Sequence, residues 1–165
     1  MNKIFFISGT DTNVGKTFIT CALIELLRKK HKNRIVAGMK PVAAGESLCN
    51  GIMINPDVYK IHISNNAKFS IKEINSYSYK EAIAPHIAAK INNRPISLDK
   101  IKADFDFLKN KTDYLFVEGA GGYHVPLSET TTTSDLINLL NIPIILVVAI
   151  RLGCLNHTML TIESI

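Results

Sequence analysis

A glycine-containing turn near the N-terminus has the residue types that bind phosphate. It reads Gly9-Thr10-Asp11-Thr12-Asn13-Val14-Gly15-Lys16-Thr17. Backbone N–H groups in such a turn, together with the N-terminus of a following helix, favour an anion. The ammonium of Lys16 adds a mobile cation for the outer phosphates of a nucleotide, and the hydroxyl of Thr17 is a ligand for Mg²⁺. The segment therefore predicts a site for ATP and Mg²⁺.

The elements on each side of this turn fit a phosphate loop. Five residues separate Gly9 from Gly15, one more than in the usual spacing of the motif. The unbroken apolar run Ile4 to Ile7 predicts a strand that is buried on both faces. Apolar residues recur close to a helical period from Thr17 to Lys30, and that stretch ends in basic residues, as a helix does. A strand, a turn and a helix in this order favour a phosphate loop over an incidental surface loop.

Strands and helices alternate along the rest of the chain. The apolar runs that predict strands are Ile4 to Ile7, Ile35 to Met39, Tyr114 to Val117 and Ile144 to Ile150. The helical patterns are Thr17 to Lys30, a short stretch after Pro56, Ile83 to Ile91, Ser97 to Lys109 and Ser134 to Asn141, with another after His157. This alternation predicts an α/β fold of the P-loop NTPase type, with a doubly wound, mostly parallel sheet and helices on both faces.

Composition limits the protein class. The 165 residues, 47% of them hydrophobic, fit a single nucleotide-binding and catalytic domain over residues 1–165. The three cysteines have no paired spacing, so neither a disulfide framework nor a zinc site is expected. The longest apolar run is too short to cross a bilayer, and the first strand begins too early for a signal peptide, so we expect a cytoplasmic protein without a membrane partner.

Basic residues give the chain a net charge of +5, and several gather between Arg28 and Arg34. A basic cluster of this kind can indicate nucleic-acid binding, but here it follows a predicted helix whose negative end it would stabilise. No aromatic residues alternate with these charges to stack on bases. We therefore expect no nucleic-acid partner.

Charged residues follow the predicted strands where ligands of such sheets bind, at the carboxyl ends. Lys40 follows the second strand, and Glu118 begins the segment Glu118-Gly119-Ala120-Gly121-Gly122 after the third. An acidic residue in this place can ligate Mg²⁺, although aspartate is commoner there. Lys40 alone would more often be a solvated loop residue. Asp57, in the first turn of a predicted helix, would by itself more often stabilise that helix than ligate a metal.

Four strand-end segments, taken together, closely resemble the dethiobiotin synthetase family of biotin biosynthesis. They are the phosphate loop, Lys40-Pro41-Val42, Glu118 to Gly122 and Leu152 to His157, and further matches include Asn55-Pro56-Asp57. The resemblance covers the whole chain. It implies an ATP-dependent closure of 7,8-diaminopelargonic acid with CO₂ to form dethiobiotin through a phosphorylated carbamate, with ADP and phosphate released. It also implies a homodimer.

The resemblance also assigns roles to residues of this chain. Lys40 and Lys16 would be the catalytic residues, and Thr17, Asp57 and Glu118 the Mg²⁺ ligands. The nucleotide would contact Asn13, Val14, Gly15, Lys16, Thr17, Phe18, Glu118, Gly119, Ala120 and Gly121. Lys40 would bind the carbamate, and Thr12 would face the diamine or the carbamate. The substrate carboxylate would be bound by the partner subunit's copy of Gly153, Cys154, Leu155 and Asn156.

Some features depart from the family pattern. Ala44 stands where many members have serine or threonine, and Asn13 replaces a glutamate found in some relatives. The helical pattern after His157 stops at Ile165 without a capping signal, and the segments with which relatives read the purine ring lie beyond that point. We therefore expect a C-terminally truncated chain.

Other readings of the same residues lead to different functions. One is a partitioning or positioning switch ATPase of the same fold, which usually has an additional lysine early in its phosphate loop; Thr10 to Asn13 contains none. Another is a related amidoligase, which would need a glutaminase domain for which 165 residues leave no room. A third is a truncated nucleotide-binding domain without activity.

Overall fold

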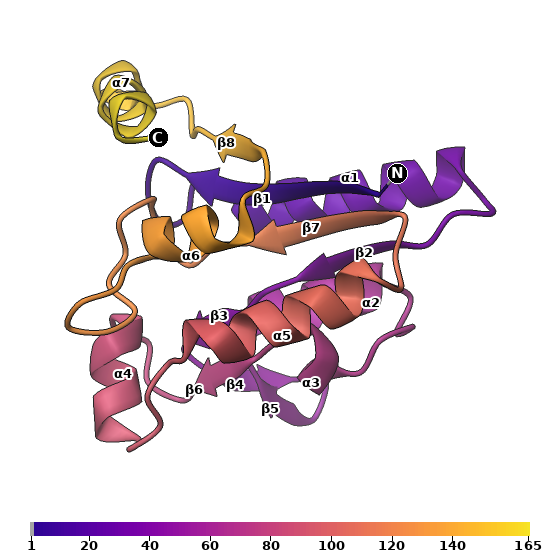
Figure 1. Ribbon diagram of the computed structural model, residues 1–165, viewed down its shortest axis with the longest axis horizontal. Helices are drawn as coiled ribbons and strands as arrows, with labels where there is room; N and C mark the ends of the chain where they lie inside the picture. The colour runs from indigo at the N-terminus through magenta and orange to yellow at the C-terminus, as the bar shows by residue number, and fades with distance from the viewer. Residues whose placement is uncertain (1) are drawn as a thin grey trace.

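A four-stranded parallel sheet forms the centre of the computed structural model, which describes residues 2–165 (Figure 1). Its strands follow the order β2-β7-β1-β8. They are β1 (Lys3–Gly9), β2 (Val36–Met39), β7 (Tyr114–Glu118) and β8 (Ile144–Val147). Every pairing between them is parallel, which confirms the predicted type of sheet. In the pairing of β1 with β7, Ile7 lies opposite Glu118, so the acidic end of β7 lies beside the strand that leads into the phosphate loop.

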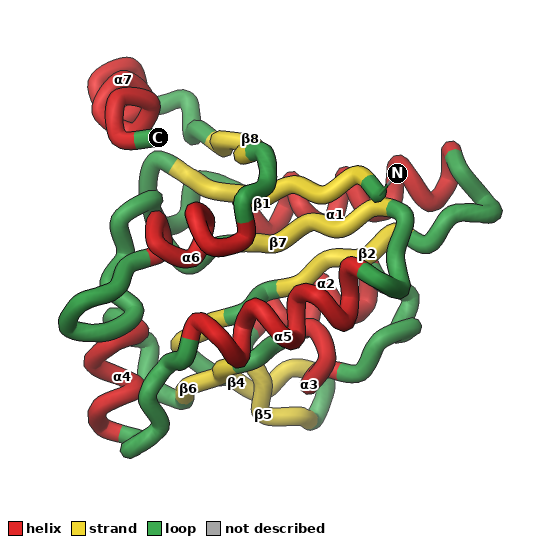
Figure 2. The backbone as a smooth tube through the Cα atoms, in the orientation of Figure 1, coloured by secondary structure: helices red, strands yellow, loops and turns green. Residues whose placement is uncertain are grey.

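Helices cover both faces of this sheet. The helices of the described residues are α1 (Lys16–Lys30), α2 (Pro56–Ser64), α3 (Ile71–Ile74), α4 (Pro85–Ile91), α5 (Leu98–Lys109), α6 (Thr133–Leu140) and α7 (Cys154–Ser164), and four of them cover the sheet. Helices α1 and α2 lie behind the sheet in Figures 1 and 2, and α5 and α6 lie in front of it. The predicted doubly wound arrangement is confirmed. Within residues 2–165, none of the helices combines the length and the apolar character that crossing a membrane requires.

Apolar side chains on both faces of the strands form the core. Neighbouring residues of β1 point to opposite faces, and both Phe6 and Ile7 are fully buried. Ile7 packs in the cluster that contains Ile24 of α1, whereas Phe6 packs in the cluster that contains Phe105 of α5 and Leu136 of α6. Complete burial of one such side chain contributes roughly 1.5–3 kcal/mol. The continuous apolar run in the sequence thus reflects helix packing on both sides.

The segment between β2 and α5 contains short strands that the sequence did not predict. They are β3 (Val42–Ala44), β4 (Ser47–Cys49), β5 (Ile52–Ile54) and β6 (Tyr77–Tyr79). Strands β3 and β6 pair in parallel, whereas β4 and β5 form an antiparallel hairpin. Its turn is Asn50-Gly51, and both residues have positive φ, of 49° and 82°. An Asn-Gly turn is a strong hairpin signal, but strands of three residues are too short to show a period.

The side chain of Asn65, just after α2, forms hydrogen bonds with the backbone of β2 on the side that has no neighbouring strand. Its Oδ1 accepts a hydrogen bond from the backbone N–H of Gly38 at 2.7 Å, and its Nδ2 donates to the Gly38 carbonyl at 2.9 Å. Gly38 has no room for a side chain, because a Cβ there would lie 2.7 Å from Ile24 and 2.9 Å from Ile61. Helices α1 and α2 therefore pack directly on the backbone of β2.

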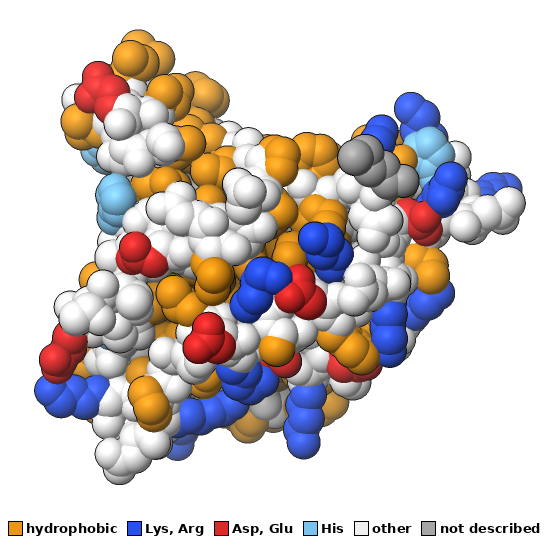
Figure 3. Space-filling view, viewed as in Figure 1, with side chains coloured by type: hydrophobic (Ala, Val, Ile, Leu, Met, Phe, Trp, Pro, Cys, Tyr) orange, Lys and Arg blue, Asp and Glu red, His pale blue; other side chains and the backbone are white. Residues whose placement is uncertain are grey.

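Strand β8 ends at Val147, before the predicted end at Ile150. Its partner β1 also ends there, since Gly9 pairs with Val147 and the chain then turns into the phosphate loop. The predicted strand was too long because pairing with β1 stops at Val147, and Ile150 at the predicted end is 91% exposed. Helix α7 follows with no buried residue, and its apolar side chains are seen at the upper left of Figure 3.

Candidate active site

The phosphate loop leads into helix α1 with its first N–H groups free of side-chain caps. Gly15 is the N-cap residue, and its φ of 100° is a left-handed conformation that suits glycine. Within the described residues, no side chain caps the N–H groups at the start of this helix. The first N–H groups of a helix have no partner within it, so this turn is able to bind an anion. Phe18, one of the residues expected to contact nucleotide, is 75% exposed.

Lys16 is folded back over the phosphate loop. Its side chain is largely buried, and its Nζ donates to the backbone carbonyl of Asp11 at 2.8 Å. Burial, and then the positive charge of Lys40, lower the pKa of Lys16 to about 8. A phosphate oxygen is a stronger hydrogen-bond acceptor for an ammonium group than a carbonyl is. Lys16 is therefore placed to exchange the loop carbonyl for an oxygen of a bound nucleotide.

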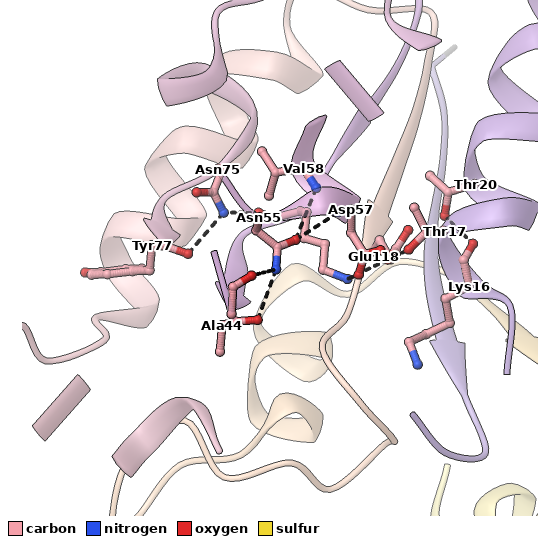
Figure 4. A network of polar contacts seen from close by, with 12 residues as sticks. Lys16, Thr17, Thr20, Ala44, Asn55, Asp57, Val58, Asn75, Tyr77 and Glu118 are labelled. Atoms are coloured by element: carbon pink, nitrogen blue, oxygen red, sulfur yellow. Dashed lines mark hydrogen bonds and ion pairs between the residues drawn. The ribbon is translucent and has the colours of Figure 1, made fainter. Parts of the chain in front are cut away.

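Lys40 is buried between the carboxylates of Asp57 and Glu118, both of which are labelled in Figure 4. Its Nζ is 2.6 Å from Oε1 of Glu118 and 2.9 Å from Oδ2 of Asp57. The hydroxyl of Thr17 donates to the same Oε1 of Glu118 at 2.6 Å. The side chain of Lys40 is 6% exposed and that of Glu118 is fully buried. Four of the predicted site residues, from α1, the end of β2, α2 and the end of β7, thus meet at one point.

The charges in this network stabilise one another. Burial disfavours the charged form of Lys40, but the Glu118 and Asp57 carboxylates raise its pKa above the ordinary value. Burial also works against the charge on Asp57, and the adjacent Lys40 lowers the pKa of that carboxyl. At neutral pH Lys40 is therefore an ammonium group and Asp57 a carboxylate. The expectation of a solvated loop lysine, which the residue type alone favours, is wrong for Lys40.

The donor atoms around Lys40 fit a magnesium ion. Oε2 of Glu118 is buried and has no hydrogen-bond partner within the described residues. One hydroxyl and two carboxylates are hard oxygen ligands of the kind that Mg²⁺ takes, usually with waters and substrate phosphates completing the octahedron. No group of three or more His, Cys, Asp or Glu side chains suited to a metal occurs in residues 2–165. A metal here would thus depend on the Thr17 hydroxyl and on ligands from outside the protein.

Two asparagines that sequence reasoning did not place in the site support it. Asn55 caps α2 by accepting from the N–H groups of Asp57 and Val58, and its Nδ2 donates to the Ala44 carbonyl at 3.0 Å. Asn75 donates from Nδ2 to the carbonyl of Lys40 at 2.7 Å. Asparagine before proline is a known helix-start signal, so Asn55 could have been identified as a cap. No local pattern indicates the role of Asn75.

The loop after Glu118 lies against the phosphate loop. A Cβ on Gly119 would be 2.9 Å from the ring of Phe6, so only glycine fits there. A Cβ on Gly121, whose φ is 61°, would be 3.5 Å from Oγ1 of Thr12. The predicted nucleotide-binding loop and the predicted substrate residue Thr12 are therefore neighbours, and Ala120 lies between the two glycines with partial exposure.

The segment Gly153 to Asn156 lies apart from the Lys40 network. It forms the start of α7, where Gly153 has a φ of 89° and no side chain caps the helix. Leu155 is 81% exposed. None of the four residues has a side-chain hydrogen bond or ion pair to Lys40, Asp57 or Glu118 within the part of the chain that is described. The structure thus brings together the predicted metal and phosphate residues but not this predicted substrate segment.

Comparisons of the sequence with known proteins assign the chain to a family. Residues 3–165 match the family model described as an AAA domain. The ATP-dependent dethiobiotin synthetase BioD of Aromatoleum aromaticum is 40% identical over 163 residues, which cover 99% of this chain and 72% of that relative. The enzyme of the same name from Francisella tularensis subsp. novicida is 46% identical over 167 residues, 99% of this chain and 71% of that relative.

A third relative agrees with these two. The ATP-dependent dethiobiotin synthetase of Wigglesworthia glossinidia brevipalpis is 42% identical over 162 residues, which cover 98% of this chain and 70% of the relative. The matches extend over the phosphate loop, the Lys40 network and α7 alike. The chain therefore belongs to the dethiobiotin synthetase family, within the proteins that share the AAA domain.

Proposed function

We propose that the chain closes the cyclic urea of dethiobiotin from 7,8-diaminopelargonic acid, CO₂ and ATP. One amine of the substrate takes up CO₂ and loses a proton to give a carbamate. A carbamate oxygen attacks the γ-phosphorus of ATP, which forms a carbamic-phosphoric anhydride and releases ADP. The second amine attacks the carbonyl carbon, expels phosphate and closes the ring. The names of the relatives support the overall reaction.

The observation that carries this proposal is the position of Lys40. Both the carbamate and the triphosphate are anions, so their reaction requires cations where charge develops. Lys40 is a buried ammonium group beside the phosphate loop. Lys16 is a second cation, and its pKa is lowered whereas that of Lys40 is raised. We assign Lys40 to the carbamate and to the transferred phosphoryl group, and Lys16 to the outer phosphates. Lys40 has to leave at least one of its two carboxylates to reach them.

We propose further that ATP and Mg²⁺ share the phosphate-loop side of the site. The free N–H groups at the start of α1 and the loop after Glu118 support the assignment of nucleotide contacts to residues 13–18 and 118–121. Thr17, Asp57 and Glu118 would hold Mg²⁺, which when bound supplies positive charge to the β- and γ-phosphates. These three side chains already converge on one point, and Glu118 has a carboxylate oxygen to spare.

We assign the diamine and its carboxylate to Thr12 and to the segment Gly153 to Asn156. Uncapped N–H groups at the start of α7 suit a carboxylate, which supports this assignment. In the family this segment acts on the substrate of the partner subunit, so the proposal includes a homodimer. It also treats residues 1–165 as one nucleotide-binding and catalytic unit. A cytoplasmic location stays a prediction.

Product analysis tests the reaction directly. The chain is incubated with ATP, Mg²⁺, bicarbonate and the diamine, and ADP and dethiobiotin are quantified by chromatography and mass spectrometry. We expect one ADP per dethiobiotin and no ADP above background when either the diamine or bicarbonate is omitted. ATP turnover that is indifferent to the diamine would contradict the proposal and favour a switch ATPase. Nucleotide binding without turnover would favour an inactive nucleotide-binding domain.

A further inference from the structure

Asp11 connects two loops that are far apart in the sequence. Its Oδ1 accepts a hydrogen bond from the N–H of Thr12 at 2.7 Å, which fixes a turn within the phosphate loop. Its Oδ2 accepts from the guanidinium of Arg151 at 2.5 Å. Its backbone carbonyl accepts from Nζ of Lys16 at 2.8 Å. One residue thus contacts a predicted substrate residue, a predicted phosphate-binding lysine and the loop between β8 and α7.

Arg151 stands at the turn that starts α7. Its carbonyl accepts the N–H of Cys154 at 3.0 Å, so its position fixes the first residues of the helix. Helix α7 has no buried side chain to hold it against the sheet. Among the ion pairs of the described residues, that of Arg151 and Asp11 is the one that joins this loop to the phosphate loop. The start of α7 therefore owes its position largely to β8 and to this pair.

The ion pair of Arg151 and Asp11 contributes little to the stability of the fold. The side chains of Arg151 and Asp11 are 54% and 46% exposed, and exposed ion pairs contribute little to folding. Hydrogen bonding from Thr12, against a smaller opposing effect of desolvation and with help from Arg151, lowers the pKa of Asp11, so the carboxylate is charged at neutral pH. A persistent surface pair between two ligand-binding loops has more effect on their relative position than on the fold.

We propose that Asp11 and Arg151 are positioning residues that hold the start of α7 against the phosphate loop of the same chain, so that the segment assigned to the acceptor carboxylate of the partner subunit's site keeps one fixed geometry. This inference rests on the proposed function for the identity of the substrate. The pair contacts neither the transferred phosphoryl group nor the carbamate. Its loss should weaken use of the diamine more than binding of the nucleotide.

Steady-state kinetics of the full chain tests this role. Arg151→Gln removes the charge, and Asp11→Asn removes it while keeping an oxygen for the N–H of Thr12. We expect each variant to raise the KM for the diamine by about fivefold to tenfold. The KM of the double variant should be no higher than that of the single variants, because both changes break the same ion pair. The affinity for ADP should change by less than about twofold. Arg151→Lys keeps one charged hydrogen bond and should restore most of the lost affinity.

A second exposed pair provides the matched control. Arg34 and Asp113 are 2.7 Å apart, with exposed side-chain fractions of 62% and 32%, and Arg34 lies just before β2. Arg34→Gln should leave the KM for the diamine unchanged. An unchanged KM in Arg151→Gln, or additive losses in the double variant, would overturn the inference.

Hydrogen exchange separates this inference from the proposed reaction, because it needs no turnover. Binding of ADP to the phosphate loop should slow exchange of the amides in residues 150–156 in the unmodified chain and in Arg34→Gln, but not in Arg151→Gln. Equal protection of this segment in all three proteins would overturn the inference even if the chain makes dethiobiotin. Loss of protection in Arg151→Gln alone would support it even if no dethiobiotin forms.

Discussion

The Lys40 network and helix α7 both contain residues assigned to substrate, yet the fold holds them in different ways. Lys40 is surrounded by α1, α2 and the end of β7, and its ammonium group is bound by the buried Glu118 carboxylate and the partly exposed Asp57 carboxylate. Helix α7 has no buried side chain, and its leading loop depends on one exposed ion pair. The residues assigned to phosphoryl transfer are thus held by the core, whereas those assigned to the acceptor belong to a surface element.

Removal of the buried ammonium should have the largest effect. We expect Lys40→Met to lower turnover by about a thousandfold, because the charge acts on the transition state, while ATP affinity is largely retained. It should also lower the free energy of unfolding by about 3 kcal/mol, since Glu118 would remain buried without its partner. Product formation and urea denaturation measure the two effects.

Lys60 provides the control for this variant, because it is an exposed lysine on α2. Lys60→Met should change neither turnover nor stability. The double variant Lys40→Met with Glu118→Gln should regain stability without regaining turnover, which separates the catalytic effect from unfolding. Turnover of Lys40→Met within tenfold of the unmodified chain would remove Lys40 from the catalytic residues.

Two leucines compare the packing of the two regions directly. Leu108 of α5 is fully buried, whereas Leu155 of α7 is 81% exposed. Leu108→Ala should destabilise the chain by about 2–5 kcal/mol, and Leu155→Ala by less than about 0.5 kcal/mol. Urea denaturation checks both values. If Leu155→Ala costs as much as Leu108→Ala, and the cost depends on protein concentration, then α7 is packed against a second chain in solution.

The pH dependence of nucleotide binding tests the electrostatics of the core site. Lys16 is a cation below its pKa of about 8 and neutral above it, so its attraction for phosphate is present at lower pH and is lost as the pH rises. Without Mg²⁺, ADP affinity should fall by about twentyfold between pH 7.5 and 9.5. Calorimetry measures this, with Lys16→Arg as a control whose charge does not titrate in this range. A flat profile in the unmodified chain would contradict a lowered pKa.

The cap of α2 should have the smallest effect on this side of the molecule. Asn55→Ala removes the acceptor for the N–H groups of Asp57 and Val58 and should cost about 1 kcal/mol of stability. Because Asp57 then loses its fixed position, the Mg²⁺ concentration needed for half-maximal turnover should rise. Asn55→Asp keeps the acceptor for the cap but loses the donor to the Ala44 and Gly45 carbonyls, so it separates the cap from these two hydrogen bonds. An unchanged Mg²⁺ requirement in Asn55→Ala would show that Asp57 is positioned without the cap.

The sequence predicted a region well where the contacts join residues close together in the chain, and poorly where they join residues far apart in it. The phosphate loop is a continuous motif, and the parallel sheet followed from the apolar runs, so Lys16, Thr17 and the end of β7 were placed correctly at one edge of the sheet. The burial of Lys40 was not predictable from its own surroundings. It depends on Asn75 and Ile74, which the short strands between β2 and α5 bring to the Lys40 backbone.

The pair of Asp11 and Arg151 shows the same limit more strongly. The two residues are separated by 140 positions, and they meet because β1 and β8 are neighbours in the sheet. No periodicity or motif connects them. The end of β8 was likewise misjudged, because the apolar character of Ile150 reflects exposed surface and not strand pairing.

The amide of Asn65 has a consequence for association between molecules. Strand β2 lies at one edge of the sheet, where free N–H and C=O groups offer a template to strands of other chains. Asn65 bonds to both groups of Gly38, as a neighbouring strand would, and α1 and α2 cover the same stretch. A strand from another molecule would have to break both bonds before it could pair. The Asn65 side chain therefore protects this stretch of the edge, as Ile74 and Asn75 do at Lys40, from the intermolecular β-pairing that leads to aggregation.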